Sequence, residues 1–70
     1  MKIIFSEHAL HRMWLRGIEK STVLFILRNP DFVEKSFSGR KIAHKKLDKL
    51  WKVVFREEKS TLVVLTVFFD

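Results

Sequence analysis

Pro30, the only proline in the chain, separates two kinds of hydrophobic pattern. Before it, apolar residues recur at the three- and four-residue spacing of a helix. After it, short segments rich in apolar and β-branched residues are broken by turn residues, which is typical of strands. Proline cannot continue a helix, and the residue before it avoids the helical conformation. We therefore expect an α+β domain in which helices precede an antiparallel sheet.

Two short helices are expected in the first half. The first should run over 7–16, with Ser6 as its N-cap and Gly17 directly after its C-terminus. Its apolar face is expected to hold Ala9, Leu10, Met13 and Trp14. The second, over 22–28 and capped by Ser21, is apolar nearly all round and should be packed on more than one side.

Four strands are expected after the helices, over 31–37, 40–47, 50–56 and 61–69. Lys2–Phe5 could add a short edge strand. Residues 1–70 then form one domain, with two N-terminal helices packed on an antiparallel sheet of about four strands.

The register of these strands depends on the turns at Ser38-Gly39 and Asp48-Lys49. If each turn has two residues, one face of the sheet, covered by the helices, carries Val33, Phe37, Ile42, Trp51, Val53 and Phe55. The opposite face then carries Lys41, Lys45, Lys52 and Arg56. Lys45 would lie directly across from Lys52, and such a like-charged pair suggests that an anion is held there. A turn of odd length would exchange the faces.

The last strand is apolar on both faces, so it should be central in the sheet. One of its faces would leave an apolar strip beside the basic patch, formed by Val63, Leu65, Val67 and Phe69. Such a strip suits a partner protein or a second copy of the chain, and a homodimer is therefore a candidate assembly.

Fourteen Lys and Arg against eight Asp and Glu give a net charge of +6, which favours phosphate-bearing partners. A merely solubilising charged surface is the alternative. The absence of cysteine excludes disulfides and thiolate metal sites, and the cytoplasm is the expected compartment. The three histidines do not make a zinc signature, and no segment is long and apolar enough for a membrane span. Neither a metal nor another cofactor is expected.

The first helix carries a cationic stripe, His8, Arg12 and Arg16, at the i, i+4, i+8 spacing that places side chains on one flank. The arginines could bind phosphate oxygens and His8 could exchange a proton near neutral pH. A solvated helix flank is the alternative.

A second basic group lies on the predicted strands and consists of Arg40, Lys41, His44, Lys45, Lys46, Lys52 and Arg56. RNA cleavage through the 2′-hydroxyl needs a base, an acid and cations that stabilise the charged phosphorane. His44 could serve in either proton role, and Arg40 could stabilise charge. The alternatives are a lysine-rich strand that protects a sheet edge and a His44 turned toward the helices. Trp14 and Trp51 are expected in the core.

The segments Phe5-Ser6-Glu7-His8-Ala9, Arg12-Met13 and Arg16-Gly17-Ile18 resemble the opening of a family of short prokaryotic proteins of unknown function. That family shows F-S-x-H-A-x-x-R-M-x-x-R-G-I, then Pro-Asp (Pro30-Asp31) and Gly-Arg (Gly39-Arg40). Its closing strands are matched by Val53-Val54-Phe55 and Leu65-Thr66-Val67.

The family in turn resembles the RelE/ParE-like toxin superfold. This resemblance implies a toxin of a toxin–antitoxin pair, often a ribosome-dependent mRNA endonuclease, with an antitoxin as partner. The chain has no tyrosine, which several RelE-type nucleases place near the cleaved phosphate, so binding is implied more directly than cleavage. We expect an RNA-binding protein for which metal-independent RNA cleavage is a candidate activity. The alternatives are a non-catalytic nucleic-acid or protein-binding module and a ParE-like topoisomerase inhibitor.

Overall fold

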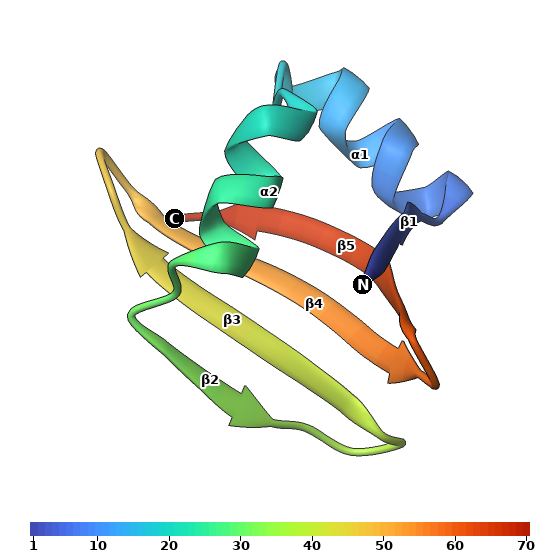
Figure 1. Cartoon of the computed structure of the whole chain (residues 1–70). Helices are drawn as coiled ribbons and strands as arrows, with labels where there is room; N and C mark the ends of the chain where they lie inside the picture. The colour runs from blue at the N-terminus through green and yellow to red at the C-terminus, as the bar shows by residue number, and fades with distance from the viewer.

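The order of elements in the computed structural model, which describes residues 1–70, is β1 (Lys2–Phe5), α1 (Glu7–Arg16), α2 (Lys20–Arg28), β2 (Phe32–Lys35), β3 (Arg40–Lys46), β4 (Leu50–Glu58) and β5 (Thr61–Phe69). The strands form one sheet in the order β1-β5-β4-β3-β2 (Figure 1). β1 pairs with β5 in parallel, and the other neighbours are antiparallel. The α+β class and the N-terminal edge strand are confirmed. The sheet, however, is mixed and five-stranded, because β1 joins its edge in parallel.

The junction between β1 and α1 is held by Ser6. Its hydroxyl accepts a hydrogen bond from the Ala9 N–H at 3.0 Å and donates one to the Leu65 carbonyl at 3.1 Å. Gly17 ends the helix in the left-handed conformation, with a φ of 67°. Both helix boundaries agree with the sequence, because a capping hydroxyl and a glycine are local signals.

α2 begins at Lys20, two residues before the predicted start, and its N-cap is Glu19 rather than Ser21. Glu19 is extended but makes no side-chain capping bond. Since no capping hydroxyl marks this start, packing sets it instead: Val23 and Ile26 are fully buried.

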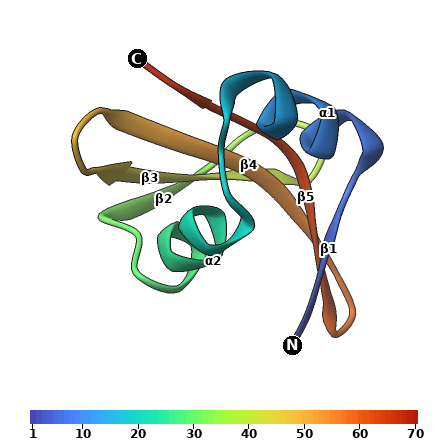
Figure 2. The ribbon, with the colours of Figure 1, turned by 90° about the horizontal axis from the view of Figure 1, so that it is seen from above.

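A single cluster of ten buried apolar residues forms the core: Ala9, Met13, Ile18, Val23, Ile26, Ala43, Val53, Phe55, Val64 and Val67. α1 lies along β5, and α2 contacts β3 and β4 (Figures 1 and 2). Because α1 packs mainly on one strand, it buries only the narrow stripe of Ala9 and Met13. Leu10 is 40% exposed and Trp14 79% exposed, so the prediction of Trp14 in the core is wrong. Trp51 is half-buried against the core.

Both hairpins around β3 have loops of three residues, not two. Ser36 donates to the Arg40 carbonyl at 2.8 Å, leaving 37–39 as the first loop. Lys46 pairs with Leu50, leaving 47–49 as the second. Compared with a two-residue loop, each three-residue loop shifts the strand pairing by one residue. The side chains of β3 therefore lie on the faces opposite to those predicted. The two shifts cancel for β2 relative to β4, so these strands keep their predicted faces.

The exchange corrects the predicted faces at several positions. Ala43 takes the buried position expected for Ile42, and it pairs with Val53. Lys41 and Lys45 therefore lie on the helix side, and Ile42 and His44 lie on the opposite face. Lys45 is opposite Trp51 rather than Lys52. Val33, Trp51, Val53 and Phe55 keep the face predicted for them, whereas Phe37 lies in the first loop and is 78% exposed.

β5 lies inside the sheet, between β1 and β4, as its apolar sequence predicts. Its register shifts by one residue, because Val54 pairs with Thr66 while Phe55 pairs with Val64. This bulge at Leu65 lets Val64 and Val67, three residues apart, both be buried. The predicted apolar strip is thereby divided, since Val63 lies on one side of the sheet and Val67 on the other.

The register predicts a clear difference between two isoleucines. Ile26→Ala removes a fully buried side chain and should lower the free energy of unfolding by about 2–5 kcal/mol. Ile42→Ala removes a partly buried side chain outside the core and should cost less than half as much. Urea denaturation of the two variants checks this. Equal losses would place Ile42 in the core and contradict the observed register.

Candidate functional site

The face of the sheet turned away from Ala43, Val53 and Val67 has no buried residue, and we call it the open face. The strand pairing places these side chains on it: Lys2, Ile4, Phe32, Glu34, Arg40, Ile42, His44, Lys46, Leu50, Lys52, Val54, Arg56, Glu58, Thr61, Val63, Thr66 and Phe68. It mixes aromatic, apolar and basic groups with two acidic ones. A face of this composition can make stacking, apolar and anion contacts with one partner.

An aromatic and cationic row crosses four strands of the open face. The Phe32 and His44 rings are stacked, with centroids 4.3 Å apart and planes 10° apart. Lys52 is the cross-strand neighbour of His44, and its Nζ lies 5.5 Å from the centre of the Phe68 ring. Lys52 also contacts Asp70 at 3.4 Å.

His44 has a carboxylate partner. Its Nε2 lies 2.5 Å from Oε1 of Glu34, and its side chain is 17% exposed while that of Glu34 is 50% exposed. A carboxylate on one ring nitrogen fixes the orientation of an imidazole. The pair therefore has the arrangement of a base with its orienting group.

Two arginines lie directly opposite one another at the other end of the open face. Arg40 on β3 pairs with Arg56 on β4. The Arg56 guanidinium is bonded to Glu58, but no carboxylate lies within 4.0 Å of Arg40. Like charges at opposed positions destabilise a strand pair by up to about 1 kcal/mol. An anion bound between them would offset that cost.

A shallow hollow of about 320 Å³ opens where β2 begins, β3 ends and β4 begins. Its lining includes Phe32, His44, Lys46, Leu50, Trp51 and Lys52. Three lysines and one acid, Asp31, contribute to it, so the hollow is positively charged. Its volume is at the low end of ligand sites and suits a group of the size of one nucleotide.

A sequence model described as a domain of unknown function, DUF4258, matches residues 5–69. The chain belongs to the DUF4258 family. No curated protein and no solved structure matches it. The predicted membership of a family of unknown function is thus confirmed, and the relation to the RelE/ParE-like superfold stays a prediction.

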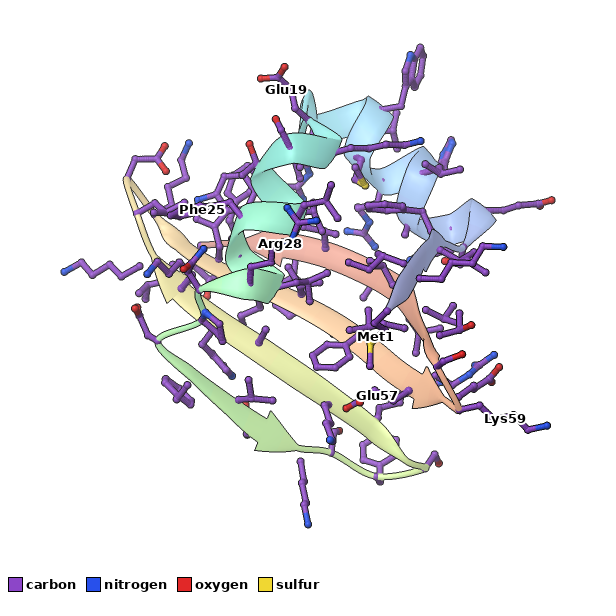
Figure 3. The ribbon with its side chains drawn as sticks, viewed as in Figure 1. Met1, Glu19, Phe25, Arg28, Glu57 and Lys59 are labelled. Carbon is purple, nitrogen blue, oxygen red and sulfur yellow. The ribbon has the colours of Figure 1, made fainter.

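Lys41 and Lys45, two predicted phosphate-binding residues, are not on the open face of the DUF4258 chain. Lys41 contacts Glu57 at 2.7 Å, and Lys45 contacts Asp31 at 3.2 Å. Lys45 also lies 5.7 Å from the centre of the Phe25 ring on α2, the helix that Figure 3 shows above the sheet. Of the predicted basic group, the open face brings together Arg40, His44, Lys46, Lys52 and Arg56.

The cationic stripe of His8, Arg12 and Arg16 lies on α1 as predicted. The Arg16 guanidinium is 5.5 Å from the centre of the Phe69 ring. Arg56 faces Val63 on β5, six residues from Phe69 and therefore about 20 Å away along the strand. Arg40 is one strand further still. Arg16 and the arginine pair accordingly do not form one site.

Phe32, Glu34 and Phe68 are open-face residues that sequence reasoning missed as site residues. The period-2 alternation of β2 and β3 would have paired Phe32 with His44 had the loop length been known. No group of three or more His, Cys, Asp or Glu side chains is arranged to hold a metal ion. Neither helix has the length and apolar character needed to cross a bilayer.

Asp31 joins the start of β2 to the end of β3. The Lys46 backbone N–H donates to its carboxylate at 2.8 Å and the Lys45 ammonium at 3.2 Å. These two hydrogen bonds, the backbone one first, lower the pKa of Asp31 below its ordinary 3.8. A carboxyl whose pKa is lowered by folding stabilises the fold above its unfolded pKa.

Asp31→Asn, which keeps an oxygen but removes the charge, should therefore lower the urea midpoint at neutral pH. The difference from the native chain should begin to close below about pH 4 and disappear as the pH falls through the folded-state pKa, because the Asp31 carboxyl is then as neutral as the asparagine amide. Urea titrations at a series of pH values measure this gap. A gap independent of pH would contradict a stabilising role for the Asp31 charge.

Proposed function

We propose that the open face binds RNA through its phosphate groups. The observation that carries this proposal is the Arg40–Arg56 pair, in which two arginines occupy directly opposed strand positions and Arg40 has no carboxylate partner. Guanidinium groups bind phosphate oxygens in a bidentate manner. A phosphate between them would replace repulsion by two attractive contacts.

The composition of the open face supports RNA over a small anion. Lys46 and Lys52 extend the positive charge toward the hollow, several residues from the arginines along the same strands. The separation between the arginine pair and Lys52 on β4 is four residues, or about 13 Å. That is about twice the spacing of neighbouring phosphates, so a chain with several phosphates would contact both groups. Exposed aromatic rings on an open sheet are also a form that RNA-binding domains use.

The resemblance to RelE/ParE-like toxins supports the same surface, because those proteins use basic residues on their sheets. If the resemblance extends to function, the protein would bind mRNA on the ribosome and an antitoxin protein would bind to it. α1 adds support for a protein partner, since Trp14 is 79%, Leu15 59% and Leu10 40% exposed. A purely protein-binding module, a ParE-like topoisomerase inhibitor and a homodimer remain the alternative proposals for these apolar groups.

The binding proposal is tested by neutralising the arginine pair. The double variant Arg40→Gln, Arg56→Gln should lose RNA affinity by about ten-fold or more and should lower the slope of log K against log salt by about 1 to 2. Fluorescence anisotropy with a labelled RNA oligonucleotide measures both quantities.

The matched control is the double variant Lys20→Gln, Arg28→Gln, which removes two positive charges from α2 instead of the open face. Arg28 is labelled on α2 in Figure 3. Its affinity should change far less. Equal losses in the two double variants would show a net-charge effect only and would contradict a site on the open face.

Metal-independent RNA cleavage is the second candidate function, favoured by the His44–Glu34 contact. In such cleavage the 2′-oxygen bonds to phosphorus and the bond to the 5′-oxygen breaks, leaving a 2′,3′-cyclic phosphate and a 5′-hydroxyl. His44 would accept the 2′-hydroxyl proton, and Glu34 would stabilise the imidazolium. Lys52, opposite His44, would stabilise the phosphorane charge, while water would protonate the leaving oxygen.

If this activity exists, His44→Gln should lower the cleavage rate by about 10²–10⁴-fold in EDTA. His11→Gln, on the exposed surface of α1, and His8→Gln serve as controls and should retain it. The assay follows labelled RNA and its cyclic-phosphate product. If His8→Gln loses cleavage activity and His44→Gln retains it, then His8 on α1, and not His44, would be the residue that accepts the proton.

A further inference from the structure

The outer face of the Phe32 ring, which is the side turned away from His44, takes no part in the phosphate binding proposed above. β2 is the last strand of the sheet, so no strand lies beyond Phe32. One face of its ring is stacked on His44, and the residue is 56% exposed. The second ring face is therefore directed past the edge of the sheet.

The row that ends at Phe32 is already a stack. The phenyl and imidazole rings are nearly parallel at 4.3 Å, and Lys52 follows His44 on the next strand. The contact between Glu34 and the imidazole fixes the ring plane of His44, and stacking on His44 fixes that of Phe32. A planar group added beyond Phe32 would extend a row whose geometry is set before binding.

The hollow beside this row supplies a place for an anion. Lys46 lies in its lining and no carboxylate is within 4.0 Å of its ammonium group. Lys52 lines it too and shares its charge with Asp70 at 3.4 Å. A free aromatic ring face with the unpaired Lys46 on the neighbouring strand matches the two halves of a nucleotide, a flat base and a charged phosphate.

We propose that a nucleobase of single-stranded RNA stacks on the outer face of Phe32 while an adjoining phosphate contacts Lys46 in the hollow. The proposal rests on RNA binding by the open face and adds the class of RNA. In an A-form duplex the ring faces of the bases are covered by their stacked neighbours, and only base edges are exposed in the grooves. Only an unpaired base can reach Phe32, so the site selects single strands.

The experiment compares a labelled single-stranded RNA of mixed sequence, about 12 nucleotides long, with the same strand annealed to its complement. The native chain should bind the single strand at least ten-fold more tightly. Phe32→Ala and Phe32→Leu should weaken single-strand binding roughly 5- to 100-fold, which corresponds to the loss of one stacked base. Phe32→Trp should restore it, because a larger ring preserves the stack.

Phe37→Ala is the matched control, since Phe37 is an exposed phenylalanine at 78% in the β2–β3 loop with no stacking partner. It should bind RNA like the native chain. Circular dichroism of each variant confirms that the fold is retained, and the leucine variant preserves apolar bulk at the edge of β2.

The outcomes separate this inference from the binding proposal. The stacking site is overturned if the native chain binds single strand and duplex equally well, or if Phe32→Ala and Phe32→Leu both keep full RNA affinity. In either case the binding proposal would still be supported if RNA binding depends on salt and is lost in the Arg40→Gln, Arg56→Gln variant. Absence of RNA binding by the native chain would overturn the binding proposal itself. Selective loss in the alanine and leucine variants with recovery in Phe32→Trp supports the stacked base.

Discussion

The register of β3 is the constraint on which the candidate site depends. Two three-residue loops, over 37–39 and 47–49, place Ala43 in the core and turn His44 outward. With loops of two residues, lysines would have occupied the open face and His44 would have packed under α2. The pairing of Phe32 with His44 and of Arg40 with Arg56 both follow from this single geometric fact.

The same register distributes the positive charge. Lys41 and Lys45, on the helix side, are neutralised by Glu57 and Asp31. Arg40 keeps its charge unpaired on the open face. The net charge of +6 therefore says less about binding than the position of a few cations, because exposed ion pairs contribute little stability but cancel much of the local field.

The open face exists because both helices pack on the same side of the sheet. The two helices and ten buried residues form a core on that side only. The apolar side chains of the open face, such as Ile42 and Val54, are half-buried and lie between basic and aromatic groups, a mixture that suits the binding face proposed above.

The sequence by itself determined the features that depend on near neighbours. The bounds of α1 follow from Ser6 and Gly17, and the bounds of β5 from an apolar segment interrupted only by Thr66. The end of α2 before Pro30 and the strand at 2–5 are likewise local. Tertiary structure decided the rest: the parallel pairing of β1, the exposure of Trp14, and the face on which His44 lies. Strand side chains alternate with a period of two, so one loop residue more or fewer reverses a face without altering the local pattern. Only the hydrogen bonds that close each hairpin fix that number, and with it the residues that meet on the open face.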